Sequence, residues 1–329
     1  MRVSGPRRTR GPRAPGGPRR TSRRGIGRRL VSLVTAVVAG VACGPPGGPP
    51  VDDDAVAPAF GDRVRIAYAD HSDGFGDLWL PGSGNGSGTE APDAPWPVVV
   101  LIHGGFWRDG YFLDLMDPLV PSLLDAGFAV WNIEYRRVGA GGGDPETFED
   151  VAAAVDRLDA LPPSFDGLLD TSRVATVGHS AGGHLAVWAA SRPSLSDGVA
   201  GADPVVVPDT AIAQAGVLDL VGCARDGVGG TACTDLLGAS PVDDPELARR
   251  TSPADMVPVD ARVVAVHGDL DRIVPLSQSV TYVDRAVEAG MDAELIVVEG
   301  ADHFVHLDPD GPAWAAVLAI LTEKKWQTE

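Results

Sequence analysis

The segment RVATVGHSAGGHLAVWAAS, residues 173–191, decides the fold of this 329-residue chain. Its first six residues form an apolar run that predicts a buried strand, and the alanine-rich part from residue 181 predicts a helix. Between the two, Ser180 stands in a Gly-x-Ser-x-Gly pattern, and only small neighbours leave room for so sharp a turn. We therefore expect the Ser180 hydroxyl to project from the carboxyl edge of a sheet, in front of a helix N-terminus.

Apolar runs and helical periods alternate on both sides of this segment. The two opening strands are predicted at 63–68 and 77–81, buried strands at 97–102, 128–133 and 173–178, and further strands at 210–216, 262–268 and 293–298. Helices are predicted at 113–126, 147–161, 181–191, 277–289 and 312–323. This alternation is typical of a mostly parallel sheet with helices on both faces. We therefore predict one α/β domain over residues 60–329, with a small cap segment.

A second glycine motif, His103-Gly104-Gly105-Phe106-Trp107, directly follows the strand predicted at 97–102. Attack of a serine on an acyl group creates an oxyanion, which requires backbone N–H donors aimed at it. Glycines allow the backbone to approach that closely. We predict that Gly104 and Gly105, together with the N–H of Ala181, form this oxyanion hole; the alternative is an ordinary glycine turn.

An acid and a base follow two later strands. VHGDLDRIVP (266–275) carries Asp269 and Asp271, and VEGADHFVH (298–306) carries His303. We predict that His303 accepts the serine proton and that Asp271 holds the imidazole in the required tautomer, with Asp269 as the competing candidate.

Three other features have alternative interpretations. His179 and His184 flank the serine, but neither has a carboxylate at a motif position, so we expect both to pack near the turn. His303 and His306 with Asp302 and Asp308 resemble a metal cluster, but the catalytic role accounts better for His303. We therefore expect no metal and no cofactor.

Charge is distributed very unevenly along the chain. The first 42 residues hold eleven of the 27 lysines and arginines and no acidic residue, which leaves 16 basic against 45 acidic residues, a net charge of about −29, in the remainder. A body this acidic repels nucleic acids and anionic membranes, so we expect neither as a partner.

The N-terminal region predicts export. The apolar run 30–42 is too short to span a bilayer but fits the core of a signal peptide over residues 1–42. SRRGIGR (22–28) is similar to a twin-arginine signal, and GVAC resembles a lipobox with Cys43 as the lipidated residue. Residues 43–59, rich in Pro, Gly and Asp, predict a tether. The expected protein is lipid-anchored at the cell surface or secreted; the alternative is a disordered tail before a short buried helix.

Cys223 and Cys233 stand ten residues apart in a glycine-rich stretch. In an oxidising compartment such a pair is expected to form a disulfide, with two free thiols as the alternative.

From about residue 60 to 325 the chain resembles the α/β-hydrolase superfamily, in which nucleophile, acid and base follow in the order Ser180, Asp271, His303. HGGFW, EYRRVG (134–139), TFEDVAAAV (147–155) and GHSAGGHLA (178–186) are similar to the esterase/lipase branch that includes kynurenine formamidases. The resemblance implies a serine carboxylesterase acting on a small-molecule ester or amide. An arylformamidase, a small prolyl-oligopeptidase-like peptidase and a non-catalytic binding module are the alternatives.

The segment between the strands ending near Gly216 and beginning near Arg262 is polar and has no long apolar face. It therefore does not predict the mobile lid of a lipase that acts on long chains. We expect an open mouth, lined in part by Phe106 and Trp107, and hydrolysis of short acyl esters.

Overall fold

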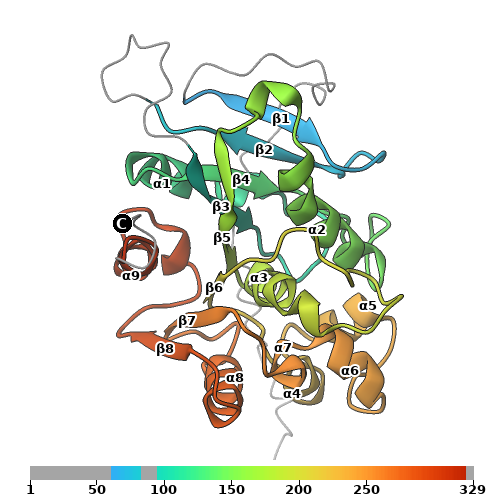
Figure 1. Cartoon of the computed structure of the whole chain (residues 1–329). Helices are drawn as coiled ribbons and strands as arrows, with labels where there is room; N and C mark the ends of the chain where they lie inside the picture. The colour runs from blue at the N-terminus through green and yellow to red at the C-terminus, as the bar shows by residue number, and fades with distance from the viewer. Residues whose placement is uncertain (1–60, 83–94, 324–329) are drawn as a thin grey trace, which may run out of the picture. The chain divides into compact units, whose positions relative to one another are not determined.

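The computed structural model describes residues 61–82 and 95–323 (Figure 1). The expected signal peptide (1–42), Cys43 and the tether (43–59) lie outside the described residues. All described residues belong to one compact unit. Among them, no helix combines the length and apolar character needed to cross a membrane.

Eight strands form one sheet in the order β1-β2-β4-β3-β5-β6-β7-β8. Their bounds are β1 Arg63–Ala67, β2 Phe75–Trp79, β3 Trp96–Ile102, β4 Ala129–Ile133, β5 Leu169–His179, β6 Thr210–Gln214, β7 Arg262–Gly268 and β8 Ala293–Val298. β2 pairs antiparallel with β1 and β4, and every other pair is parallel. The prediction of a mostly parallel α/β sheet is confirmed.

Helices cover both faces of this sheet, as the alternating side chains of β3 indicate. Val98, Val100 and Ile102 pack on one side with α2 (Glu146–Asp156) and α3 (Ala181–Ser191). Val99 and Leu101 pack on the other side with α1 (Val120–Asp125) and α9 (Pro312–Leu321). Figure 1 shows α1 and α9 on the face of the sheet opposite α2 and α3. Successive side chains of a strand point to opposite faces, so an apolar run such as VVVLI requires cover on both.

The helix predicted over 113–126 is broken. The structure has 3₁₀ turns at Leu113–Leu115 and Asp117–Leu119, and only then α1. The reason is Pro118 and Pro121, because a proline lacks the backbone N–H and fits only the first turn of a helix.

Four short helices fill the segment between β6 and β7, which the sequence characterised only as polar. They are α4 (Leu220–Asp226), α5 (Ala232–Leu237), α6 (Pro245–Thr251) and α7 (Pro253–Met256). The remaining helix, α8 (Ser277–Glu288), precedes β8. α4 and α5 end at Gly227 and Gly238, both in the left-handed conformation.

The expected disulfide between Cys223 and Cys233 is present and joins α4 to α5. Both cysteines are buried with Leu220 and Leu236 in the main core. The bridge therefore fastens α4 and α5, the first two helices of the cap segment, which have only seven and six residues.

Removing this bridge should lower stability without abolishing chemistry, because no candidate catalytic residue lies inside the loop. For a loop of this length, we expect the Cys223→Ser, Cys233→Ser double variant to lose about 2–3 kcal/mol of unfolding free energy. Thermal denaturation with and without reductant measures the effect, and the double variant, which has no bridge, serves as the control that reductant should not change. Alkylation of both Cys223 and Cys233 in a non-reduced digest of the purified protein would contradict this prediction.

Candidate active site

Ser180 occupies a strained turn between β5 and α3. Its backbone has φ 57° and ψ −117°, a region that costs a non-glycine residue about 1–3 kcal/mol. The Ser180 N–H donates to the carbonyl of Gln214 in β6 at 2.8 Å. Gly178 and Gly182 lie so close together that a Cβ on Gly178 would overlap the Gly182 carbonyl. The turn therefore forms only with glycine at such positions, which accounts for the motif.

His303 and Asp271 are brought together by the loops after β8 and β7. The Nδ1–H of His303 donates to Asp271 Oδ2 at 2.7 Å. The other carboxylate oxygen accepts the N–H groups of Ile273 (2.8 Å) and Val274 (2.9 Å). Burial alone raises the pKa of Asp271, but the hydrogen bonds from His267 and His303 outweigh burial and hold the pKa well below its usual range. The carboxylate thus stays ionised and keeps the proton on Nδ1 of His303, leaving Nε2 as the nitrogen that can act as a base.

Asp269, the competing acid, has a different partner. Its Oδ1 accepts the N–H of Gly300 at 2.6 Å, which ties the loop after β7 to the loop after β8. The geometry therefore brings Asp271 to His303 and gives Asp269 a loop-bracing contact.

His179, the residue before Ser180, connects the turn to the candidate base. Its Nε2–H donates to the backbone carbonyl of His303 at 2.9 Å, and the two rings lie 4.6 Å apart. Burial and the neighbouring His303 lower the pKa of His179 well below its usual value. His179 is thus a neutral brace that fastens the His303 loop beside the serine.

His184 lies one turn into α3 and has no exposed surface. Its Nε2–H donates to the carbonyl of Thr251 at 2.7 Å, and its Nδ1 accepts the indole N–H of Trp107 at 3.2 Å. Burial lowers its pKa to about 4, so the ring is neutral at ordinary pH. This contact set is that of a packing histidine.

The loop after β3 lies directly against the serine turn. A Cβ on Gly104 would lie 2.7 Å from the carbonyl of His179 and 3.1 Å from the Cβ of Ser180. Among the described residues, no acceptor bonds the backbone N–H of Gly104, Gly105 or Ala181. These three donors are therefore available to an oxyanion formed at Ser180.

A buried polar network supports this loop, and sequence reasoning missed it. His103 donates from Nδ1 to the carbonyl of Gly104 (2.8 Å) and from Nε2 to Glu134 Oε1 (2.9 Å), and its ring stacks on Tyr135. Arg137 donates to the same carboxylate. Burial raises the pKa of Glu134, but His103 and Arg137 more than compensate and lower it. In the sequence, the position of Glu134 directly after a buried parallel strand was the one indication that its side chain belongs to the site.

The two predicted pocket residues have different positions. Phe106 is partly exposed and its ring rests on Gly229, between the bridged cysteines. Trp107 is 0% exposed and packs in the core, which differs from the expectation that it lines an open mouth. Tyr111, which packs on Gly105, and Phe304 are 46% and 60% exposed beside the site.

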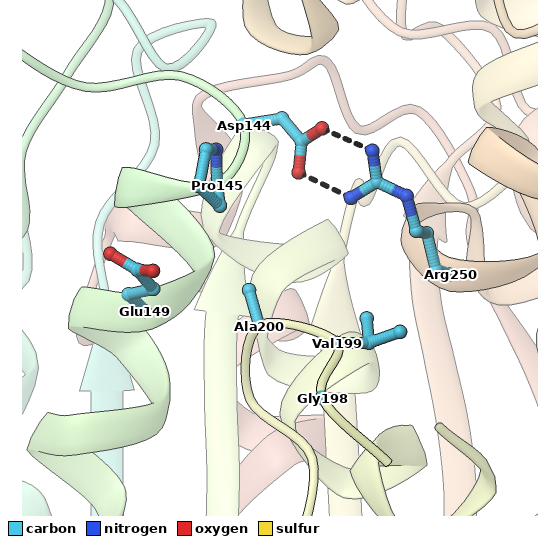
Figure 2. A pocket seen from close by; sticks show the side chains of 7 residues that line it. All are labelled: Asp144, Pro145, Glu149, Gly198, Val199, Ala200 and Arg250. Carbon is cyan, nitrogen blue, oxygen red and sulfur yellow. Dashed lines mark hydrogen bonds and ion pairs between the residues drawn. The ribbon is translucent and has the colours of Figure 1, made fainter. Parts of the chain in front are cut away.

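A cavity of about 350 Å³, drawn in Figure 2, has none of these residues among the described residues that line it. It is bounded by the start of α2, the loop 198–200 and Arg250, whose guanidinium forms two hydrogen bonds with Asp144 at 2.7 and 2.6 Å. None of the described residues that line it is a candidate nucleophile, and its Asp144–Arg250 ion pair is already satisfied. Within the described ranges, no group of three or more His, Cys, Asp or Glu side chains is arranged to hold a metal ion.

Two buried histidines make stability depend on pH. Burial lowers the pKa of His184 and His306 to about 4, whereas a histidine in an unfolded chain titrates near about 6.5. Between these values the unfolded chain binds protons that the folded protein does not, so acid favours unfolding. The unfolding free energy should be undiminished above pH ~6.5 and fall as the pH drops towards 4, by about 3 kcal/mol per histidine.

Urea denaturation across this pH range measures the effect. The ring of His306 has no hydrogen-bond partner among the described residues, so His306→Leu should flatten the pH dependence. Phe304→Leu, at an exposed position two residues away that carries no titratable group, is the control. Equal slopes for wild type and His306→Leu would refute the assignment.

Comparison with known proteins identifies the family. Residues 89–285 match the BD-FAE family. The esterase LipC of Mycobacterium tuberculosis is 27% identical over 68% of this chain and 54% of its own length. The probable carboxylic ester hydrolase LipM of the same organism is 30% identical over 69% of this chain and 53% of its own length. The match thus spans about half the length of these curated relatives.

Solved structures agree on the fold. A truncated carbohydrate esterase from gut microbiota superposes with a TM-score of 0.69 at 22% identity, covering 84% of this chain and 98% of that one. An acetyl ester-xyloside bifunctional hydrolase from Caldicellulosiruptor lactoaceticus gives 0.62 at 19% identity, covering 82% and 98%. The predicted α/β-hydrolase fold is therefore confirmed. Since the family match extends over more than half of the sequence, the chain belongs to the BD-FAE family.

Proposed function

We propose that the protein hydrolyses carboxylic esters through a Ser180–His303–Asp271 triad and an acyl-enzyme. The observation that carries the proposal is the Asp271–His303 hydrogen bond of 2.7 Å. His303 is in turn bonded through its backbone carbonyl to His179, the residue that precedes Ser180. The names of LipC and LipM, an esterase and a probable carboxylic ester hydrolase, favour an ester as the substrate.

In this mechanism, Ser180 Oγ attacks the ester carbonyl carbon while Nε2 of His303 takes its proton. The carbonyl oxygen becomes an oxyanion that accepts hydrogen bonds from the N–H groups of Gly104, Gly105 and Ala181. Collapse of the intermediate expels the alcohol, which receives the proton from His303. Water then attacks the acyl-serine by the same steps, releasing the acid and restoring Ser180.

Asp271 stays ionised throughout and stabilises the imidazolium that forms on His303. Its low pKa suits this role, because a carboxyl that took up the proton would lose the charge that pairs with the imidazolium.

Removing the nucleophile or the base tests the triad. Ser180→Ala and His303→Ala should each lower kcat by at least ~10³-fold with the fold intact, because each removes a group that nothing replaces. Labelling by a fluorophosphonate should be lost in Ser180→Ala. Asp271→Asn should also lose activity, whereas Asp269→Asn is the matched control two residues away. Labelling that persists in Ser180→Ala, or equal effects at 269 and 271, would contradict the assignment.

The cap segment predicts short substrates. α4 to α7 have four to seven residues each and α4 is bridged to α5, so the segment offers no long apolar lid. We expect acyl groups of two to about six carbons with aryl leaving groups, and no interfacial activation. kcat/KM for p-nitrophenyl butyrate should exceed that for the palmitate ester. The reverse order would refute the open mouth, and faster turnover of N-formylkynurenine than of any ester would favour the arylformamidase alternative.

We also propose that the enzyme is exported and held at the cell surface by a lipid on Cys43. The proposal rests on the arginine-rich start, the 13-residue apolar run and the GVAC sequence, all outside the described residues. The acidic body gives a complementary reason, because a folded domain with this charge has no electrostatic attraction to an anionic bilayer.

A further inference from the structure

Three consecutive residues of the loop after β3 have left-handed backbones. Gly105 has φ 118°, Phe106 has φ 56° and Trp107 has φ 54°. Aromatic residues rarely adopt this region, so the surrounding contacts must hold the loop in place. The same loop carries the N–H groups of Gly104 and Gly105, whose direction relative to Ser180 depends on this conformation.

Backbone contacts hold one side of the loop. The carbonyl of Trp107 accepts the N–H of Val138 at 2.8 Å, and the Asp109 N–H donates to the Val138 carbonyl at 3.0 Å. These bonds run to the segment after β4, so they do not set the position of the loop relative to α3, the helix that Ser180 precedes.

The side chain of Trp107 makes the connection to that helix. Its fully buried indole N–H donates to Nδ1 of His184 in α3, and the two rings pack edge to face at 5.2 Å. Because the Nε2–H of His184 is engaged by the carbonyl of Thr251, the ring has one tautomer, with Nδ1 free to accept. The His184 N–H in turn donates to the carbonyl of Ser180 at 3.2 Å.

We propose that His184 is a positioning residue, which fixes the oxyanion-hole loop relative to Ser180 through its hydrogen bond to Trp107. This inference rests on the proposed esterase function. It gives the second histidine of GHSAGGH a part in the reaction without a part in proton transfer, since His184 never contacts the reacting atoms. The loop and the nucleophile are thereby held to one rigid helix, as an oxyanion hole requires.

The test compares two buried tryptophans. Trp107→Phe keeps an aromatic ring but removes the N–H donor. Trp188→Phe is the matched control, because Trp188 is also fully buried, lies in α3 itself and donates its indole N–H to the Arg250 carbonyl at 3.0 Å. Each variant loses one hydrogen bond from a buried indole, but only the bond of Trp107 connects to the oxyanion-hole loop.

The readouts are kcat, KM and the inhibition constant of a short alkylboronic acid, whose serine adduct places an oxygen in the oxyanion hole. Trp107→Phe should lower kcat by ~10–100-fold with KM within ~3-fold, and should weaken boronate binding by the same factor as kcat. The reason is that misdirected N–H donors weaken mainly the hydrogen bonds to the oxyanion, which exists in the transition state and not in the bound substrate. Trp188→Phe should leave kcat and boronate binding within ~2-fold of wild type.

A second pair at His184 keeps the test decisive if Trp107→Phe fails to fold. His184→Asn retains an acceptor one bond from Cγ, near the position of Nδ1, and should keep most of the activity. His184→Leu removes the acceptor and should behave like Trp107→Phe. Equal kcat and boronate affinity in Trp107→Phe and Trp188→Phe, or in the two His184 variants, would overturn the inference. A wild-type protein without Ser180-dependent hydrolysis would instead overturn the proposed function, and this inference with it.

Discussion

The close approach of the backbone between residues 178 and 183 and the end of β3 is the constraint on which the site depends. A Cβ on Gly182 would overlap the carbonyl of Ile102, and a Cβ on Gly183 would lie 2.8 Å from the Cα of Gly216. Glycine lets three adjacent parallel strands and α3 meet at one edge, and this crowding places Ser180 beside the loop of Gly104. Ser180 must adopt a positive φ in this arrangement, which costs conformational free energy. The burial of all residues of α3 offsets this cost.

Burial then assigns different chemistry to side chains of the same kind. His179, His184 and His306 each have a pKa lowered chiefly by burial, so their rings are neutral near pH 7 and serve as packing and hydrogen-bonding groups. His303 is the histidine whose Nδ1 meets a carboxylate at the edge of the sheet, and Asp271 keeps its charge because hydrogen bonds more than compensate for burial. The environment, and not the residue type, therefore separates the candidate base from its neighbours.

Sequence patterns predicted the features that depend on local rules. The strands, α3 and the Gly-x-Ser-x-Gly turn follow from apolar runs and from the small residues that a sharp turn demands. The patterns were less informative for features that depend on contacts between residues distant in the sequence. The break before α1 follows from two prolines and was within reach, but α4 and α5 depend on a disulfide and on burial against the core. The network of Glu134 and Arg137 includes His103, which lies 31 residues before Glu134, and a local sequence pattern cannot contain such a pair.

Trp107 illustrates why a motif locates chemistry better than it describes a pocket. An aromatic residue after the glycines of HGGFW suggests a pocket wall, and for Phe106 the partly exposed side chain fits that interpretation. A left-handed backbone at both positions, however, lets the chain direct Trp107 into the core, where its indole N–H needs an acceptor and finds His184. Of the two adjacent aromatic residues, Phe106 thus packs on Gly229, and Trp107 stabilises the loop through its contacts in the core. In the proposed esterase, substrate preference would be set by Phe106, Tyr111, Phe304 and the bridged cap segment, whose mutual distances depend on the tertiary fold and not on any motif.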